Sequence, residues 1–310
     1  MAAAAPALEL AGLTRRFGAL TAVDGLSLTV RRGELFGLVG PDGAGKTTTL
    51  RMLAGVLRPS AGEARLLGVS VGRDPERVKH SIAYMSQRFG LYTDLTVAEN
   101  LDFYADLYRV PRAERPARLE RLYRFSALEP FRERLAGQLS GGMKQKLALS
   151  CCLVHEPEIL LLDEPTFGVD PISRRDLWLI VHEMVAHGTT VVVSTAYMDE
   201  AERFDRLAML HRGRLLALDT ADALQAAFPA ELVALPVDRP REARAAAGTL
   251  AAVRRAAVFG DQLHLTVGSA AADGPAIAAA LRGAGFAPGE PRRIEPSLED
   301  VFIERIGETA

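Results

Sequence analysis

Cysteine, aromatic residues and long apolar runs are all scarce in this sequence of 310 residues. Its two cysteines, Cys151 and Cys152, are adjacent in an apolar stretch, so they lack the spacing of a metal site and are expected in a core. A chain without a disulfide framework suits a reducing compartment. No run approaches the roughly 18 apolar residues that span a bilayer. The opening stretch also lacks the basic flank and long apolar core of a signal peptide.

An excess of charge of one sign is absent as well, since the formal net charge is −2. There is therefore no overall basic surface for nucleic acid, and we expect no nucleic-acid partner. We expect a cytoplasmic protein, which a partner would have to hold at any membrane where it works. The length of 310 residues predicts two domains.

The stretch of residues 35–49 contains the strongest motif. Leu35 to Val39 predicts a buried strand, a loop of the form G-x-x-x-x-G-K-T follows, and a helical pattern comes next. In such a loop the backbone N–H groups point at an anion, Lys46 reaches the β- and γ-phosphates, and the Thr47 hydroxyl suits Mg²⁺. The predicted nucleotide-binding residues of this stretch are Gly40, Pro41, Asp42, Gly43, Ala44, Gly45, Lys46, Thr47 and Thr48. Alone, the loop indicates only a nucleoside-triphosphate-binding protein.

Two carboxylates follow a second apolar run, at residues 158–164. The run predicts a buried parallel strand whose carboxyl end faces a ligand. Asp163 is then a candidate for holding Mg²⁺, and Glu164 for orienting and activating a water. The alternative, a strand end solvated by two acids, is disfavoured by the phosphate loop upstream.

A second candidate anion site begins at Ser140. This residue is a good N-cap for a helix running to about Val154, and Gly141 and Gly142 permit close backbone approach. The alternative is an ordinary capped helix. Upstream of the phosphate loop, Phe17 either stacks on a purine base or simply packs.

The rest of the chain predicts an α/β domain at residues 1–227 and an accessory domain at residues 228–310. Alternating apolar and polar residues predict an antiparallel hairpin or small sheet over 7–30, with Arg15 and Arg16 in a solvated turn. Strands alternating with helices predict a mostly parallel core sheet, and residues 96–135 are expected to be helical. The further predicted elements are strands at 64–67, 82–85 and 189–194, a helix at 173–187, and a hairpin turn at Arg212-Gly213.

After residue 227 the pattern changes to a β-α-β-β-α-β order, which predicts a small ferredoxin-like α+β domain. Its predicted elements are strands at 231–237, 253–259, 262–267 and 291–295, and helices at 241–248 and 275–282. An amphipathic helix at 298–303 closes the chain. We find no catalytic constellation there and expect a regulatory or packing module.

Five motifs of this chain, taken in order, resemble those of the ATP-binding cassette (ABC) family of transport ATPases. They are Gly40–Thr47, Gln87, Leu139–Gly142, Asp163-Glu164 and Asp170. The match covers roughly residues 7–225. The resemblance implies a P-loop cassette with a mixed core sheet, an antiparallel β subdomain and a helical subdomain at about residues 88–155. It also implies ATP and Mg²⁺ as cofactors.

The resemblance assigns roles to individual residues. It makes Phe17 the adenine-stacking aromatic and Gln87 the loop glutamine that contacts Mg²⁺ and the attacking water and responds to the membrane partner. Asp170 becomes the aspartate that acts across a dimer. In this family two cassettes pair head to tail, and each ATP lies between the phosphate loop of one and the Ser140-Gly141-Gly142 equivalent of the other. The implied catalytic residues are Glu164, Gln87 and Lys46, and the implied metal-binding residues are Thr47, Gln87 and Asp163.

Within the family, residues 89–101, 163–178 and 197–210 are similar to the ATPase subunits of bacterial drug-export systems, which carry their permease on a separate chain. This implies a peripheral position on the cytoplasmic face of the cell membrane, the inner membrane where there are two. The permease's cytoplasmic helix is expected near Gln87, including residues 89–95. The terminal domain is similar to the small domain appended to many such subunits.

Three residues depart from the family pattern. Ala196 stands where histidine is usual, Met143 where glutamine is usual, and Asp42 where asparagine or serine is usual. Alanine cannot hydrogen-bond the γ-phosphate, so attenuated hydrolysis is expected. The expected dimer pairs this chain either with itself or with a different cassette. The alternatives are a regulatory or degenerate cassette and a soluble ABC ATPase acting on DNA or ribosomes. The short span from Lys46 to Ser140, the absence of zinc cysteines and the single cassette disfavour the last class.

Overall fold

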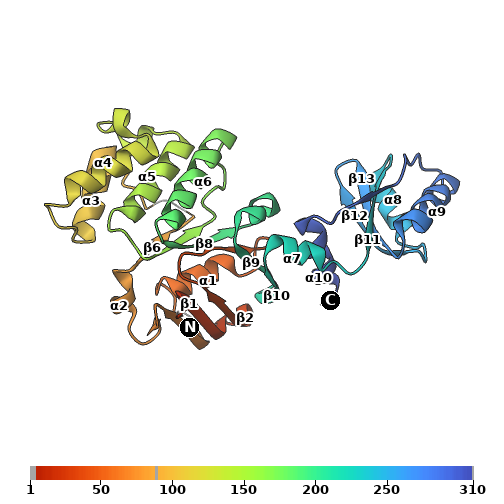
Figure 1. Cartoon of the computed structure of the whole chain (residues 1–310), viewed down its shortest axis with the longest axis horizontal. Coiled ribbons are helices and arrows are strands. Elements are labelled where there is room, and N and C mark those ends of the chain that lie inside the picture. Colours follow the sequence, from red (N-terminus) through yellow and green to blue (C-terminus); the bar gives the residue numbers. More distant parts are fainter. Residues whose placement is uncertain (1–4, 88–89, 309–310) are drawn as a thin grey trace. The chain divides into compact units, whose positions relative to one another are not determined.

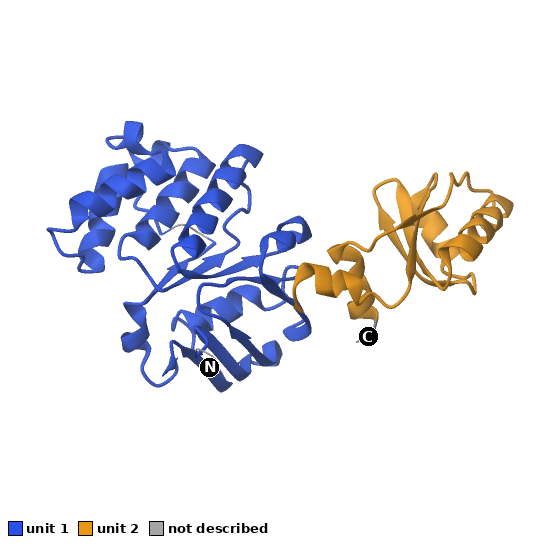
Figure 2. Cartoon of the chain, in the orientation of Figure 1, with its two compact units in different colours: residues 1–218 blue, residues 219–310 orange. Residues whose placement is uncertain are grey.

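The computed structural model of the chain describes residues 5–87 and 90–308. It forms two compact units, Met1–Leu218 and Asp219–Ala310, which are coloured separately in Figure 2. The expected domain boundary lay after residue 227, whereas the units divide after Leu218. The difference arises because helix α7 (Ala221–Ala226) packs against helix α10 (Leu298–Glu308) of the second unit.

A six-stranded sheet forms the centre of the first unit, in the order β10-β9-β3-β8-β7-β6 (Figure 1). Its strands are β3 (Leu35–Val39), β6 (Ile82–Met85), β7 (Ile159–Asp163), β8 (Thr190–Thr195), β9 (Arg206–His211) and β10 (Arg214–Asp219). The pairs β6–β7, β7–β8, β3–β8 and β3–β9 are parallel, as the sequence predicts. Because every residue of β3, β7 and β8 is buried, these strands are the continuous apolar runs expected of a sheet covered on both faces.

A second sheet of the first unit is antiparallel where its pairings are given, with the order β2-β1-β4-β5. Its strands are β1 (Leu8–Phe17), β2 (Leu20–Val30), β4 (Ala61–Leu66) and β5 (Val69–Ser70). The predicted turn at Arg15 and Arg16 is wrong, since both residues belong to β1 and pair with β2. Register shifts between Leu10 and Arg16 blur the alternating pattern there, so the strand continues further than the pattern indicates.

The remaining helices of the first unit surround these sheets. They are α1 (Lys46–Leu53), α2 (Pro75–Lys79), α3 (Val97–Leu107), α4 (Arg115–Ser126), α5 (Gly141–Leu153) and α6 (Pro171–Ala186), with short 3₁₀ turns at Glu129–Phe131, Ala136–Gln138 and Met198–Arg203. Figure 1 shows α3 and α4 beside α5, with α6 on the other side of α5. The predicted helical stretch at 96–135 is therefore broken, because Arg109 and Ala127 take left-handed backbone angles that end α3 and α4.

The second unit follows the β-α-β-β-α-β order that the sequence predicts. Its sheet has the order β12-β13-β11-β14, and all three pairings are antiparallel. The elements are β11 (Glu231–Pro236), α8 (Pro240–Ala247), β12 (Val253–Phe259), β13 (Gln262–Val267), α9 (Ala270–Gly283) and β14 (Arg292–Ile294). Helix α9 begins five residues before the expected start, because the Ser269 hydroxyl caps it by accepting a hydrogen bond from the Ala272 amide.

The two faces of this small sheet are covered differently. Leu263 and Leu265 of β13 pack in the core with helices α8 and α9. His264 lies between them in the strand and so points to the other face, where its Nδ1 lies 2.8 Å from Asp300 Oδ1 of α10. The helix expected at 298–303 thus lies against the sheet of its own unit.

Candidate functional site

The phosphate loop, residues 40–47, connects the end of β3 to the start of α1 as predicted. Gly45 takes φ of 100°, and a Cβ at this position would lie 2.5 Å from the Ala22 carbonyl oxygen. Only glycine fits this turn without displacing the neighbouring strand. The buried Lys46 ammonium group donates to the carbonyl oxygens of Gly40 at 2.7 Å and Pro41 at 3.1 Å, so it lies curled against its own loop.

A cavity of about 540 Å³, the nucleotide cavity, opens at this loop. It brings together ten of the predicted site residues, namely Phe17, Asp42, Gly43, Ala44, Gly45, Lys46, Thr47, Thr48, Gln87 and Glu164. Gly40 and Pro41 lie at the start of the loop and contribute carbonyl groups to Lys46. The residues come from β1, the loop, α1 and the ends of β6 and β7, so the site joins both sheets of the first unit.

Glu164 is held by two partners inside the nucleotide cavity. Its Oε1 lies 3.2 Å from Lys46 Nζ, and its Oε2 accepts a hydrogen bond of 2.8 Å from the Gln87 side-chain amide. The residue follows the last position of β7 and takes φ of 50°, a left-handed angle that is uncommon for a residue with a side chain. The two candidates for water activation and the candidate phosphate cation therefore form one connected group.

Asp163 lies directly beneath this group and is 1% exposed. Its Oδ1 accepts hydrogen bonds from the hydroxyls of Thr47 at 2.9 Å and Ser194 at 2.8 Å. Its Oδ2 accepts from Tyr84 at 3.1 Å. Burial, with the Asp163 carboxylate adding to it, raises the pKa of Tyr84 to about 12, so this phenol remains a donor at neutral pH. Thr47 and Asp163 thus place a hydroxyl and a carboxylate oxygen side by side, the hard ligands that Mg²⁺ prefers.

A second cluster of predicted site residues does not line the nucleotide cavity of this chain. It consists of Ser140, Gly141, Gly142 and Asp170. Ser140 caps α5 by accepting a hydrogen bond from the Met143 amide, as predicted. Asp170 caps α6 and accepts from the amides of Ile172 and Ser173. The hydrogen bond from the Ser173 amide is the main reason that the pKa of Asp170 is lowered. A Cβ at Gly142 would lie 2.1 Å from Ser173 Oγ, so the starts of α5 and α6 touch.

The aromatic side of the nucleotide cavity is formed by Phe17, a residue that is 45% exposed. The Arg15 guanidinium lies over one face of this ring, 4.5 Å from its centroid. A large exposed ring beside a phosphate loop can stack on a nucleotide base.

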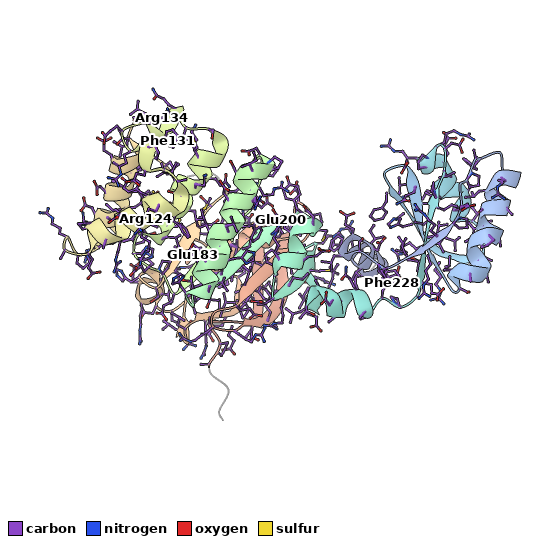
Figure 3. The ribbon with its side chains drawn as sticks, turned by 45° about the horizontal axis from the view of Figure 1, so that its top comes forward. Arg124, Phe131, Arg134, Glu183, Glu200 and Phe228 are labelled. Atoms are coloured by element: carbon purple, nitrogen blue, oxygen red, sulfur yellow. The ribbon has the colours of Figure 1, made fainter. Side chains whose placement is uncertain are left out.

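Ala196 follows the last residue of β8, is exposed and presents no polar atom on its side chain. The 3₁₀ turn that follows, Met198–Arg203, contains the buried residue Glu200, which is labelled in Figure 3 and is 1% exposed. Its carboxylate accepts hydrogen bonds from Thr195 Oγ1 at 2.7 Å and Trp178 Nε1 at 3.4 Å. The chain after β8 is therefore well anchored although the position of Ala196 is apolar.

Several residues of the site are not predicted from the sequence. Leu20, Thr21, Ala22 and Arg212 line the nucleotide cavity, and Tyr84 and Ser194 hold Asp163. The sequence feature that could have identified Arg212 is the predicted Arg-Gly turn, which places this side chain near the phosphate loop. Ser194 stands near the carboxyl end of a predicted parallel strand, where polar residues commonly face a ligand. Among the described residues, no group of three or more His, Cys, Asp or Glu side chains could hold a metal ion by itself.

Comparison with known proteins identifies relatives of the whole chain. A family model described as ABC transporter matches residues 23–167. The probable multidrug ABC transporter ATP-binding protein YbhF of Escherichia coli strain K12 is 51% identical over 211 residues, which cover 67% of this chain and 36% of that protein. The chain thus matches little more than a third of the length of that relative. The Nod factor export ATP-binding protein I of Rhizobium sp. strain N33 is 37% identical over 306 residues, and 97% of each chain is covered.

A solved structure gives the same fold for the first unit. The dimeric, post-hydrolysis structure of the ATP-binding cassette MJ0796 bound to ADP and Pi matches with a TM-score of 0.63 and 26% identity. The match covers 69% of this chain and 98% of that chain. In the part of the chain that the structure describes, no helix combines the length and the apolar character needed to cross a membrane.

Proposed function

Because the chain belongs to the ABC transporter family and carries its ATPase cassette, we propose that it binds and hydrolyses ATP to drive export of small molecules. The observation that carries this proposal is the nucleotide cavity. It holds the phosphate loop, the Lys46–Glu164 ion pair and the Gln87 amide within one space of about 540 Å³. A triphosphate in this loop places its terminal phosphate beside the carboxylate that would orient water.

In this proposal Lys46, the loop amides and the start of α1 bind the phosphates, and Phe17 stacks on the adenine. Glu164 accepts a proton from the attacking water, and Gln87 holds the carboxylate in place through its hydrogen bond of 2.8 Å. Thr47 and Asp163 would hold Mg²⁺, with Gln87 as a further ligand. When bound there, Mg²⁺ would neutralise charge on the phosphate oxygens.

We propose that a second cassette completes the site. Ser140, Gly141 and Gly142 lie away from the chain's own nucleotide cavity, which leaves their helix start available to the ATP of a partner. Two helix starts would then close on one triphosphate from opposite sides. The relative MJ0796 is dimeric in its structure, which supports this arrangement. Asp170 lies against Gly142 and would act at the same dimer contact.

We also propose a separate membrane permease as partner, which would hold the chain on the cytoplasmic face of the cell membrane. Two exposed rings, Tyr92 of the expected docking segment and Phe103 of α3, pack edge to face with centroids 4.5 Å apart. They offer an apolar surface for a permease helix. The expected docking surface began at Phe89, which lies outside the described residues, and continues over residues 90–95.

The exported substrate class rests on relatives alone. One relative is named for multidrug transport and another for Nod factor export, so we propose small organic molecules.

Ala196 supports slow hydrolysis at the site of this chain. It therefore also supports pairing with a cassette that differs from this one. The same residue favours a second candidate function, a regulatory cassette that binds ATP without hydrolysing it.

We propose residues 1–227 as the cassette and residues 228–310 as an accessory domain.

The proposal is tested by purifying the affinity-tagged chain from detergent-solubilised membranes of its source cell. We expect an integral-membrane protein to co-purify and the complex to release phosphate from Mg-ATP. A complex without turnover would instead support the regulatory function. Recovery of the chain entirely from the soluble fraction, with no membrane protein attached, would refute the transport proposal.

A further inference from the structure

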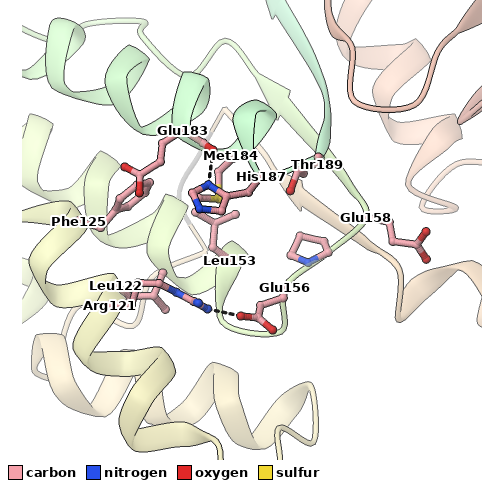
Figure 4. Close-up of a pocket in the computed structure, with 12 residues that line it drawn as sticks. Arg121, Leu122, Phe125, Leu153, Glu156, Glu158, Glu183, Met184, His187 and Thr189 are labelled. Carbon is pink, nitrogen blue, oxygen red and sulfur yellow. Dashed lines mark hydrogen bonds and ion pairs between the residues drawn. The ribbon is translucent and has the colours of Figure 1, made fainter.

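A second cavity, of about 350 Å³, lies in the first unit at the amino-terminal ends of β7 and β8 (Figure 4). We call it the α4–α6 cavity, because side chains of α4 and of the ends of α5 and α6 form its walls. The phosphate loop lies at the carboxyl ends of the strands, so the two cavities open at opposite ends of the strands of this sheet. Among the residues that the structure describes, none lines both cavities.

The floor of the α4–α6 cavity is apolar. Leu122 of α4 and Leu153 of α5 are buried, and Phe125 and Met184 are half-buried beside them. Apolar side chains from three helices therefore surround a space of the size that small organic ligands occupy.

One negative charge at the rim is not compensated. Glu156 pairs with Arg121 and with Arg118, the latter at 3.2 Å, so its charge is balanced. Glu158 pairs with Arg32 at 3.2 Å, and Figure 4 shows its carboxylate pointing away from the cavity. The carboxylate of Glu183, by contrast, forms no hydrogen bond or ion pair with any described residue.

A second acceptor lies next to Glu183. His187 Nδ1 is 2.7 Å from the Glu183 carbonyl oxygen, and this bond is drawn in Figure 4. A carbonyl oxygen can only accept, so Nδ1 carries the hydrogen. In the neutral ring Nε2 is then an acceptor. The polar end of the cavity thus offers a carboxylate and an imidazole nitrogen, both of which accept hydrogen bonds.

We propose that the α4–α6 cavity binds a small organic amine with an apolar body. The protonated amino group donates to Glu183 and His187, and its charge balances the carboxylate. The apolar body covers Leu122, Phe125, Leu153 and Met184. A simple metal cation would leave this floor exposed, and an organic acid would be repelled by Glu183.

The proposal is tested with 4-phenylbutylamine as the probe and the full chain labelled with ¹³C-methyl methionine. The chain contains seven methionines, and Met184→Leu identifies the signal of Met184. We expect a saturable shift of that signal. We expect the amine to bind about tenfold more tightly than the neutral isostere 4-phenylbutan-1-ol, since one charge-assisted hydrogen bond is lost. The acid 4-phenylbutyrate should bind more weakly still.

Glu183→Gln removes the charge at an exposed position, so the fold should be unchanged. We expect this variant to bind the amine and the alcohol equally. Glu120→Gln is the matched control, because it removes a carboxylate from the exposed surface of α4 that does not line the cavity. An unshifted Met184 signal, equal binding of amine and alcohol to the natural chain, or equal losses in the two variants would overturn the proposal.

Discussion

Lys46 and Glu164 form an ion pair inside the nucleotide cavity, with Nζ and Oε1 3.2 Å apart and side chains only 4% and 10% exposed. The candidate phosphate cation and the candidate base therefore neutralise each other. In the proposed function, a phosphate group that replaced Glu164 as the partner of Lys46 would free this carboxylate. One contact would then couple binding of a triphosphate to release of the carboxylate toward water.

Lys46→Ala should weaken ATP binding by at least about tenfold, because it removes the buried cation of the phosphate loop. Isothermal titration calorimetry of the purified chain with ATP measures this loss. Lys79→Ala removes an exposed lysine that pairs with Glu76, and it should leave the affinity unchanged. Equal affinities in the natural chain and Lys46→Ala would contradict the assignment of the site.

Glu164→Gln should keep ATP binding and lower the hydrolysis rate by about 10²–10⁴-fold, the usual contribution of a general base. Binding should not weaken, since the amide keeps the shape while the ion pair that occupies Lys46 is lost. Phosphate release and calorimetry measure the two quantities separately. Glu158→Gln, at the far end of β7, should change neither. Turnover at the natural rate in Glu164→Gln would remove this residue from the base role.

Ala196→His should raise the ATPase rate of the purified chain about tenfold or more, because in the proposed function it would supply one hydrogen-bond donor to the γ-phosphate. Affinity for ATP should change less, since the loop amides and Lys46 are unaltered. Ala196→Leu adds bulk without a donor and should give no rise. If histidine leaves the rate unchanged and the natural chain already turns over briskly, the proposed pairing with a different cassette fails.

Tyr108→Phe should alter the alkaline stability of the first unit. Burial, with smaller contributions from Cys152 and Cys151, raises the pKa of Tyr108 to about 12, whereas a tyrosine in an unfolded chain ionises near pH 10. The resulting stabilisation is complete below pH 10 and is lost as the pH rises toward about 12. The free energy of unfolding in urea should therefore fall less steeply over this range in Tyr108→Phe, which keeps the stacking on His155. Parallel pH profiles of the two chains would count against this.

The sequence predicts elements whose pattern is local. Strands β3 and β7 are uninterrupted apolar runs, and the turn at Arg212-Gly213 contains a glycine, which adopts left-handed angles readily, so the sequence predicts all three. The break between α3 and α4 was missed, because Arg109 gives no sign in the sequence that its backbone becomes left-handed.

The candidate site could be predicted as a set of motifs but not as a set of contacts. Tyr84 and Ser194 both contact Asp163 because β6 and β8 flank β7 in the sheet. The hydrophobic pattern of a sequence does not predict this strand order. The ion pair of Lys46 with Glu164 likewise depends on the spatial neighbourhood of β3 and β7. The roles given to these residues by resemblance remain predictions.

The contact between the starts of α5 and α6 makes positions 142 and 173 interdependent in evolution. A methyl group at Gly142 would overlap the Ser173 hydroxyl at 2.1 Å, so alanine at 142 is tolerable only in a chain that has first lost the Ser173 side chain. Glycine at 173 alone would cost helix propensity in α6. Each single step is unfavourable, and lineages of this protein are therefore expected to keep the Gly142–Ser173 pair or to exchange both residues.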